Sequence, residues 1–193
     1  DTHFVNCTGL TAEGHVTSAY DIALMSRELM LHHPDIRRYT TVWMDTLRDG
    51  ASSLVNTNKL VRYYKGATGL KTGTTSKAGC CVAATAERDG MELVAVVMGG
   101  ENSNERFSGA KKLLDYGFAN WAFTTLTADL SNAGVVPVKK GVGASVTPEA
   151  SGKVDLLLEK GKTDQITQQL ELAEQLEAPV AVGDEIGRVK FML

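Results

Sequence analysis

A lysine, a threonine and a glycine stand next to one another at Lys71-Thr72-Gly73, and further glycines precede them at Gly66 and Gly69. An ammonium group beside a hydroxyl group can hold a carboxylate, and a glycine lets another peptide approach the backbone closely. If these residues lie on a strand, a peptide can pair along the edge of that strand. The alternative interpretation is an exposed turn that carries one surface lysine, and the triplet alone does not exclude it.

Two apolar segments directly after the triplet favour the strand. Residues 80–88 and 91–98 are rich in valine and alanine, and Asp89-Gly90 separates them. Asp-Gly between two such runs is a strong signal for a β-hairpin. We therefore predict an antiparallel sheet that has residues 71–74 at its edge, next to the two hairpin strands.

Amphipathic helices are predicted before and after these segments. In residues 17–32, Thr17 or Ser18 can cap the helix, and apolar side chains recur on one face. In residues 104–121, the apolar side chains are those of Phe107, Leu113, Leu114, Phe118 and Trp121. Because the apolar face of a sheet needs a cover, the second helix is expected to lie on the far face of the predicted sheet.

The character of the sequence changes after residue 124. Short apolar segments alternate with Gly-Lys, Thr-Pro and Gly-Asp turns. Residues 163–178 fit either a helix or strands, and the neighbouring segments favour strands. We predict an α+β protein with a mixed first domain over residues 1–124 and a small all-β domain of short antiparallel strands over residues 125–193.

Composition and charge exclude several classes of protein. With 43% hydrophobic residues and a formal net charge of −3, the chain is not a disordered one. No apolar run approaches the roughly 20 residues needed to cross a bilayer, and a pI near 5.8 disfavours a nucleic-acid binder. Cys7, Cys80 and Cys81 are too few for a disulfide framework, and no set of residues has the spacing of zinc ligands. We therefore expect neither a metal nor a cofactor.

The order of several motifs resembles that of the D-alanyl-D-alanine carboxypeptidases among the low-molecular-mass penicillin-binding proteins. The motifs are His3-Phe4-x-Asn6-x-x-Gly9-Leu10, Ser18-Ala19-x-Asp21-x-Ala23, Asn56-x-Asn58-x-Leu60, Gly69-Leu70-Lys71-Thr72-Gly73-x-Thr75-x-Lys77-Ala78-Gly79 and Val97-Met98-Gly99-Gly100. The resemblance implies that residues 1–124 are the C-terminal part of a penicillin-binding/β-lactamase-like transpeptidase domain, an antiparallel sheet with covering helices. Residues 125–193 resemble, more loosely, the small β-rich C-terminal domain of that family, which is expected to end early at Leu193.

The resemblance also implies a serine-type carboxypeptidase that acts through an acyl-enzyme. A serine attacks the carbonyl between two D-alanines, the terminal D-alanine leaves, and water hydrolyses the ester. The implied catalytic residues are Lys71, Thr72 and Gly73, and the implied substrate-binding residues are Lys71, Thr72 and Thr74. Lys71 would set the positive potential and the proton network, Thr72 would hydrogen-bond the terminal carboxylate, and Gly73 would keep the strand edge open. The N–H of Thr74, which stands where many relatives carry histidine, would form part of an oxyanion hole.

The chain departs from the family in its other catalytic motifs. The family order is Ser-x-x-Lys, then Ser-x-Asn, then Lys-Thr-Gly. No Ser-x-Asn exists here, and the one Ser-x-x-Lys, Ser108-Gly109-Ala110-Lys111, follows the triplet on the second predicted helix. We therefore expect the nucleophile to come from a missing N-terminal half of the catalytic domain, and this chain to be inactive alone.

The implied partners are peptidoglycan stem peptides that end in D-Ala-D-Ala, β-lactam antibiotics and the missing N-terminal half, and nucleic acid is not among them. The implied location is extracytoplasmic, for a secreted protein at the outer face of the cytoplasmic membrane or the cell wall. Membrane contact is expected only through a C-terminal tail that these residues lack. An alternative is a non-catalytic cell-wall-binding or scaffold module of the same fold. A β-lactamase is disfavoured, because those enzymes generally lack the small β domain.

Other residues receive a structural interpretation. Arg106 and Lys65 are expected on the solvated surface rather than at the substrate cleft. His3 and His15 match positions of the family, but they are expected to brace loops rather than to act as bases.

Overall fold

A three-stranded antiparallel sheet organises the first part of the chain in the computed structural model, which describes residues 1–193. Its strand order is β3 (Ala67–Thr75), β4 (Gly79–Arg88) and β5 (Met91–Gly100). Asp89 and Gly90 join β4 to β5 with φ values of 51° and 76°. Two consecutive positive φ angles are what a type I′ hairpin turn requires. The predicted hairpin is confirmed, and β3 lies at the edge of the sheet.

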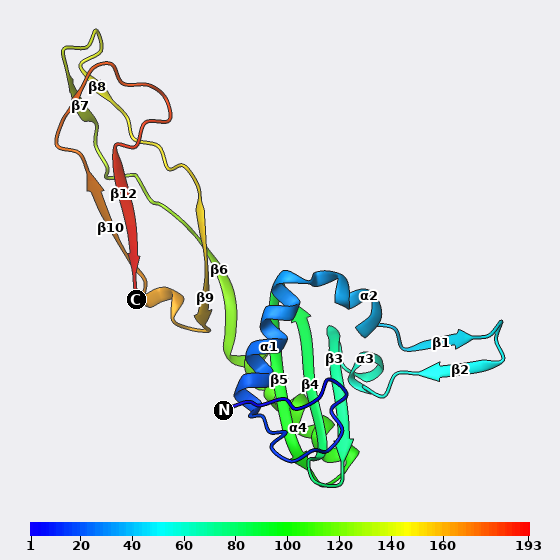
Figure 1. Cartoon of the computed structure of the whole chain (residues 1–193). Coiled ribbons are helices and arrows are strands. Elements are labelled where there is room, and N and C mark those ends of the chain that lie inside the picture. The colour runs from blue at the N-terminus through cyan, green and yellow to red at the C-terminus, as the bar shows by residue number, and fades with distance from the viewer. The chain divides into compact units, whose positions relative to one another are not determined.

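Two long helices cover the faces of this sheet (Figure 1). Helix α1 (Ala19–His32) begins at Ser18, whose Oγ accepts a hydrogen bond of 3.1 Å from the N–H of Asp21. Helix α4 (Ser103–Asn120) contacts β4 and β5 on the opposite face from α1. Its buried apolar residues are Phe107, Ala110, Leu114 and Phe118. Both predicted helices are present, and Phe107, Leu114 and Phe118 of the second one lie in the core. Leu113 is instead 50% exposed, and Trp121 lies in the strand that follows the helix.

Shorter elements connect α1 to the sheet. They are a 3₁₀ turn at Pro34–Ile36, α2 (Arg37–Thr40), β1 (Met44–Leu47), β2 (Ser52–Val55) and α3 (Leu60–Tyr63). Strands β1 and β2 form a separate antiparallel hairpin, which the sequence patterns did not predict. In the N-terminal loop, Nδ1 of His15 accepts a hydrogen bond of 3.1 Å from the N–H of Val5. This contact agrees with a loop-bracing role for His15.

Short β-strands make up the second unit of the chain, Trp121–Leu193, while the first unit is Asp1–Asn120. Its strands are β6 (Trp121–Thr127), β7 (Val136–Lys139), β8 (Ser145–Val146), β9 (Lys153–Glu159), β10 (Thr167–Leu172), β11 (Leu176–Glu177) and β12 (Gly187–Met192). Apart from a 3₁₀ turn at Thr163–Gln165, the ambiguous segment 163–178 contains strands, as predicted. Strand β11 pairs with β7 in parallel, so the expectation of purely antiparallel strands is wrong at this pair.

The chain is therefore an α+β protein with a small all-β second unit. The division between the units lies between Asn120 and Trp121, so β6 spans the boundary expected at 124/125 and belongs to the second unit. No helix has the length and apolarity needed to cross a membrane.

Tyr64 links the core of the first unit to a charged cluster. Its side chain is 5% exposed, and its hydroxyl donates a hydrogen bond of 2.8 Å to Oδ1 of Asp115. The Arg88 guanidinium lies 4.6 Å from the Tyr64 ring centroid and 4.4 Å from that of Phe118. Burial first, and the hydrogen bond to Asp115 second, raise the pKa of Tyr64 to about 12. Both effects disfavour the phenolate.

We predict that the first unit loses stability at high pH through Tyr64. Because its pKa is higher in the folded than in the unfolded chain, its contribution is fully present below about pH 10 and is lost as pH rises toward the folded-state pKa. Urea denaturation at several pH values should show a smaller loss above pH ~10 in Tyr64→Phe than in wild type. Tyr63→Phe is the matched control, because Tyr63 is 75% exposed. Equal alkaline losses in wild type and Tyr64→Phe would contradict the prediction.

Candidate active site

The four residues singled out by the sequence, residues 71–74, all lie on edge strand β3. This strand pairs with β4 on one side only, with Thr72 opposite Val82 and Thr74 opposite Cys80. The side chains of Lys71 and Thr74 are exposed, and that of Thr72 is half-buried. The other edge of β3 has no strand neighbour in this part of the chain, so a peptide can reach it.

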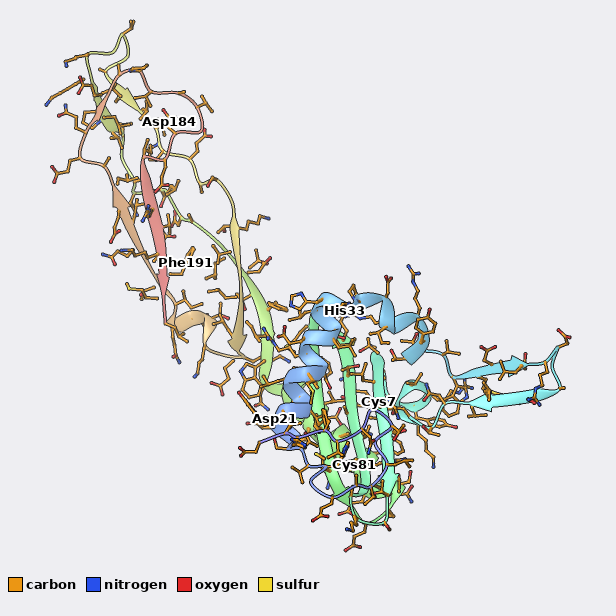
Figure 2. The ribbon with its side chains drawn as sticks, viewed as in Figure 1. Cys7, Asp21, His33, Cys81, Asp184 and Phe191 are labelled. Atoms are coloured by element: carbon orange, nitrogen blue, oxygen red, sulfur yellow. The ribbon has the colours of Figure 1, made fainter.

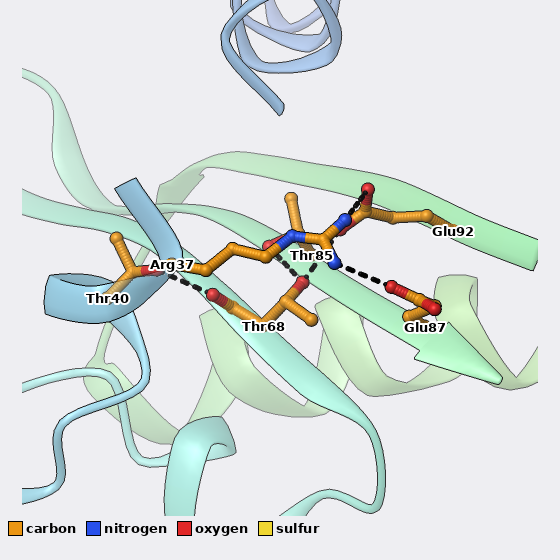
Figure 3. Close-up of polar contacts among 6 residues, drawn as sticks. All are labelled: Arg37, Thr40, Thr68, Thr85, Glu87 and Glu92. Atoms are coloured by element: carbon orange, nitrogen blue, oxygen red, sulfur yellow. Dashed lines mark hydrogen bonds and ion pairs between the residues drawn. The ribbon is translucent and has the colours of Figure 1, made fainter. Parts of the chain in front are cut away.

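A polar network holds the start of β3 against α2 (Figure 3). Arg37 donates through Nη1 to Glu87 at 2.7 Å and through Nη2 to Glu92 at 2.6 Å. Glu87 and Glu92 are cross-strand neighbours on β4 and β5, where two like charges would otherwise repel each other. The Thr68 hydroxyl lies 3.0 Å from Oε1 of Glu92 and 2.8 Å from the Thr85 hydroxyl. Arg37 thus joins α2 to β4 and β5 near the start of the candidate site.

Two further side chains fix the backbone immediately before the triplet. The Thr40 hydroxyl donates to the Thr68 carbonyl at 2.6 Å, and Nδ2 of Asn58 donates to the Gly69 carbonyl at 2.7 Å. Gly69 has a φ of +154°, and a Cβ at this position would lie 2.8 Å from Cβ and 2.9 Å from Oγ1 of Thr40. Only glycine fits here without displacing the side chain that holds Thr68.

Arg106 corrects one expectation from the sequence. Its side chain is 7% exposed rather than solvated, and it reaches from α4 to the sheet. Nη1 donates to the carbonyls of Gly73 and Cys81, at 3.2 Å each, and to Oγ1 of Thr74 at 3.1 Å. The expected surface position is wrong because Arg106 falls on the buried helical stripe that continues at Ala110. That i, i+4 spacing is the signal that could have identified it.

The polar groups at this edge form a site that is deficient in negative charge. Lys71 donates to the Thr72 carbonyl, and the Arg106 guanidinium donates to carbonyl and hydroxyl oxygens, so neither cation is paired with a carboxylate. Oγ1 of Thr57 lies 2.7 Å from Oγ1 of Thr72, a contact that the sequence patterns did not predict. Two unpaired cations and a hydroxyl pair beside an open strand edge can hold an anion.

The Cys80 thiol lies beside the site, 3.7 Å from Oγ1 of Thr74, while no hydrogen bond joins Ser108 or Lys65 to residues 71–74. The Ser108 hydroxyl donates to the Glu105 carbonyl at 3.0 Å on the exposed side of α4. Lys65 is exposed, as expected. All three cysteines are free; Cys7 lies on the N-terminal loop and Cys81 on β4 (Figure 2). No group of three or more His, Cys, Asp or Glu side chains is arranged to hold a metal ion.

The fold is that of the penicillin-binding proteins. Over the whole chain, the structure is similar to that of penicillin-binding protein 5 from Haemophilus influenzae, with a TM-score of 0.67 and 29% identity, covering 56% of that protein. It is also similar to penicillin-binding protein D2 from Listeria monocytogenes in the cefotaxime-bound form, with a TM-score of 0.56 and 35% identity, covering 61% of this chain and 48% of that one.

Two protein families match successive parts of the chain. Residues 1–102 match D-alanyl-D-alanine carboxypeptidase, and residues 124–193 match the C-terminal domain of penicillin-binding protein 5. The chain belongs to the D-alanyl-D-alanine carboxypeptidase family. The carboxypeptidase DacF of Bacillus subtilis is 35% identical over 191 residues, which are 97% of this chain and 49% of that protein. The carboxypeptidase DacA of Escherichia coli is 28% identical over 195 residues, or 48% of its length. The chain thus spans about half the length of the curated relatives it matches.

We predict that the stability of the site is sensitive to a methyl group at Gly69 and insensitive to one at Gly73. Gly69→Ala combines an unfavourable φ with a clash against Thr40 and should lower the free energy of unfolding by roughly 1–3 kcal/mol. Gly73→Ala is the matched control on the same strand, because a Cβ there meets nothing within 4 Å. Chemical denaturation of the two variants measures the difference. Equal stability of both variants would mean that Thr40 does not constrain β3.

Proposed function

We propose that this chain supplies the Lys-Thr-Gly strand of a serine-type D-Ala-D-Ala carboxypeptidase. Its substrates are peptidoglycan stem peptides, from which it removes the terminal D-alanine through an acyl-enzyme, and it binds β-lactams at the same site. The observation that carries the proposal is the open edge of β3, where Lys71 and the buried Arg106 have no carboxylate partner. Family membership and the cefotaxime-bound relative support it.

Each residue at the edge has a distinct role in this proposal. The substrate peptide adds to β3 as a further strand, and Thr72 donates a hydrogen bond to its terminal carboxylate. Lys71 and Arg106 provide the positive potential that attracts this anion. Gly73 leaves free the space that a side chain would fill. The N–H of Thr74 stabilises the oxyanion, a contribution typically worth about 3–4 kcal/mol for one donor.

The nucleophile belongs, in our proposal, to polypeptide outside these 193 residues. No Ser-x-Asn motif occurs in the chain, and the hydroxyl of Ser108 is bonded within α4. A serine from the other half attacks the carbonyl carbon between the two D-alanines. Its proton passes to a lysine base and then to the amine of the leaving D-alanine, after which water hydrolyses the ester.

An exposed apolar surface is consistent with our proposal that a second half of the catalytic domain covers this part of the chain. β5 pairs with β4 alone, so one of its edges is free. On the adjacent helix α1, Tyr20 is 72% exposed, and Leu24 and Leu31 are also exposed. Contiguous exposed apolar side chains beside a free strand edge are typical of a surface that another part of a protein covers.

The substrate determines where the protein works. Peptidoglycan stem peptides lie outside the cytoplasmic membrane, so we propose an extracytoplasmic, secreted enzyme at the membrane's outer face or in the wall. The second candidate function is a non-catalytic wall-binding module of the same fold that keeps the Lys-Thr-Gly edge without a nucleophile.

Labelling with a fluorescent penicillin separates the enzyme from the binding module. The 193-residue chain should take up no covalent label, and a longer chain that includes the preceding half should take up one label per molecule. Ser108→Ala is the control, and it should leave the labelling of the longer chain unchanged. A stable label on the 193-residue chain, mapped to Ser108, would refute the assignment of the nucleophile. An unlabelled longer chain would favour the binding module.

Substitutions on β3 test the two roles assigned to Lys71 and Thr72 in the longer chain. Lys71→Ala should slow acylation by all substrates, because the substitution removes the positive electrostatic potential of the ammonium group and a relay for the transferred proton. Thr72→Ala should lower kcat/KM by about 10- to 100-fold for peptides with a free terminal carboxylate, since a hydrogen bond to a charged group is worth roughly 1.5–3 kcal/mol. Release of D-alanine measures both, and Thr46→Ala on the separate β1–β2 hairpin is the control. Unchanged rates in Thr72→Ala would contradict the proposal that Thr72 binds the terminal carboxylate.

A further inference from the structure

The loop between β2 and α3 is anchored on both sides of Thr57. Nδ2 of Asn56 donates to the carbonyls of Val42 at 2.8 Å and Thr40 at 3.3 Å, and its Oδ1 accepts the N–H of Asn58 at 2.9 Å. These bonds tie the loop to the last residue of α2 and to the segment that follows it. The position of the residue between the two asparagines therefore does not depend on its own side chain.

The second anchor attaches the same loop to β3. Asn58 is 3% exposed, its Nδ2 donates to the Gly69 carbonyl at 2.7 Å, and its Oδ1 accepts the N–H of Leu60 at 3.2 Å. Thr57 itself is exposed, and its Oγ1 lies 2.7 Å from Oγ1 of Thr72. The loop thus holds one hydroxyl against the hydroxyl of the candidate carboxylate-binding residue.

The hydrogen-bonding capacity of two hydroxyls limits how this pair can work. Each hydroxyl has one proton and two lone pairs, so one proton is shared between Thr57 and Thr72 and the other is free. When Thr72 donates to an anion, Thr57 must be the donor to Thr72. That bond occupies a lone pair of Thr72, restricts the rotation of its hydroxyl, and polarises its O–H toward the anion.

We propose that Thr57 is a positioning residue, which directs the Thr72 proton toward the terminal carboxylate and so sets the preference for peptides with a free C-terminus. This inference rests on the proposed carboxypeptidase function. Thr57 acts through Thr72 and does not itself touch the scissile bond. Because both hydroxyls are accessible to water, their mutual bond adds little to folding stability. Its effect is therefore expected in substrate recognition.

The test uses the longer chain that includes the preceding half, with Thr57→Val and Thr57→Ser. The substrates are a synthetic peptide that ends in D-Ala-D-Ala and the same peptide with a C-terminal amide. Thr57→Val should lower kcat/KM for the acid about three- to tenfold, mainly through KM, and leave the amide nearly unchanged, because cooperative polarisation acts on the carboxylate bond. Thr57→Ser keeps the hydroxyl and should restore the preference. Thr46→Val is the matched control on an exposed threonine of β1.

The outcomes separate this inference from the function on which it rests. If wild type releases D-alanine and Thr57→Val keeps the full preference for the acid, the positioning role is overturned and the carboxypeptidase stands. Equal losses with acid and amide, together with a lower melting temperature, would indicate a structural role and also overturn it. If the wild-type longer chain releases no D-alanine, the proposed function fails, and this inference fails with it.

Discussion

The hydrogen bonds from Thr40 and Asn58 to two consecutive carbonyls, those of Thr68 and Gly69, are the contacts on which the site depends. An edge strand normally presents a row of unpaired backbone groups to any partner. Here that row is occupied at its first residues, and it becomes available only from the Lys-Thr-Gly segment onward. Under the proposed function, a substrate peptide would therefore pair with β3 from the Lys-Thr-Gly segment onward. The two anchors hold the backbone at the start of the strand and leave the following residues open.

Two arginines of the first unit have opposite surroundings. Arg37 is satisfied by two carboxylates on neighbouring strands, and its charge serves to hold α2 against the sheet. Arg106 is more deeply buried, yet its acceptors are neutral oxygens on Gly73, Thr74 and Cys81. A buried cation with neutral partners keeps most of its field. Arg37 therefore has a structural role. The charge of Arg106 remains available to an anion at the edge of β3.

Local signals predicted most of the fold, and long-range contacts account for what they did not predict. The Asp89-Gly90 turn specifies its hairpin by itself, because few residue pairs adopt two positive φ angles. The strand carrying Lys-Thr-Gly followed from that hairpin. Arg106 was assigned to the surface because a charged residue type outweighed its helical spacing. Thr57 was missed because its partner is 15 residues away in sequence and is reached through a loop whose anchors are asparagine side chains. The parallel pairing of β11 with β7 likewise has no local signal.

The open edge of β3 could pair with a second copy of the chain, and the positive charges beside the edge oppose this pairing. A strand that accepts a peptide substrate offers the same backbone groups to a second copy of itself, which is a route to aggregation. Two copies paired through this edge would bring two Lys71 ammonium groups and two buried Arg106 charges toward one another, and that repulsion opposes self-pairing. A peptide with a terminal carboxylate meets attraction at the same place. Under the proposed function, the charge of Lys71 therefore also disfavours the pairing of two copies through the strand edge that receives the substrate.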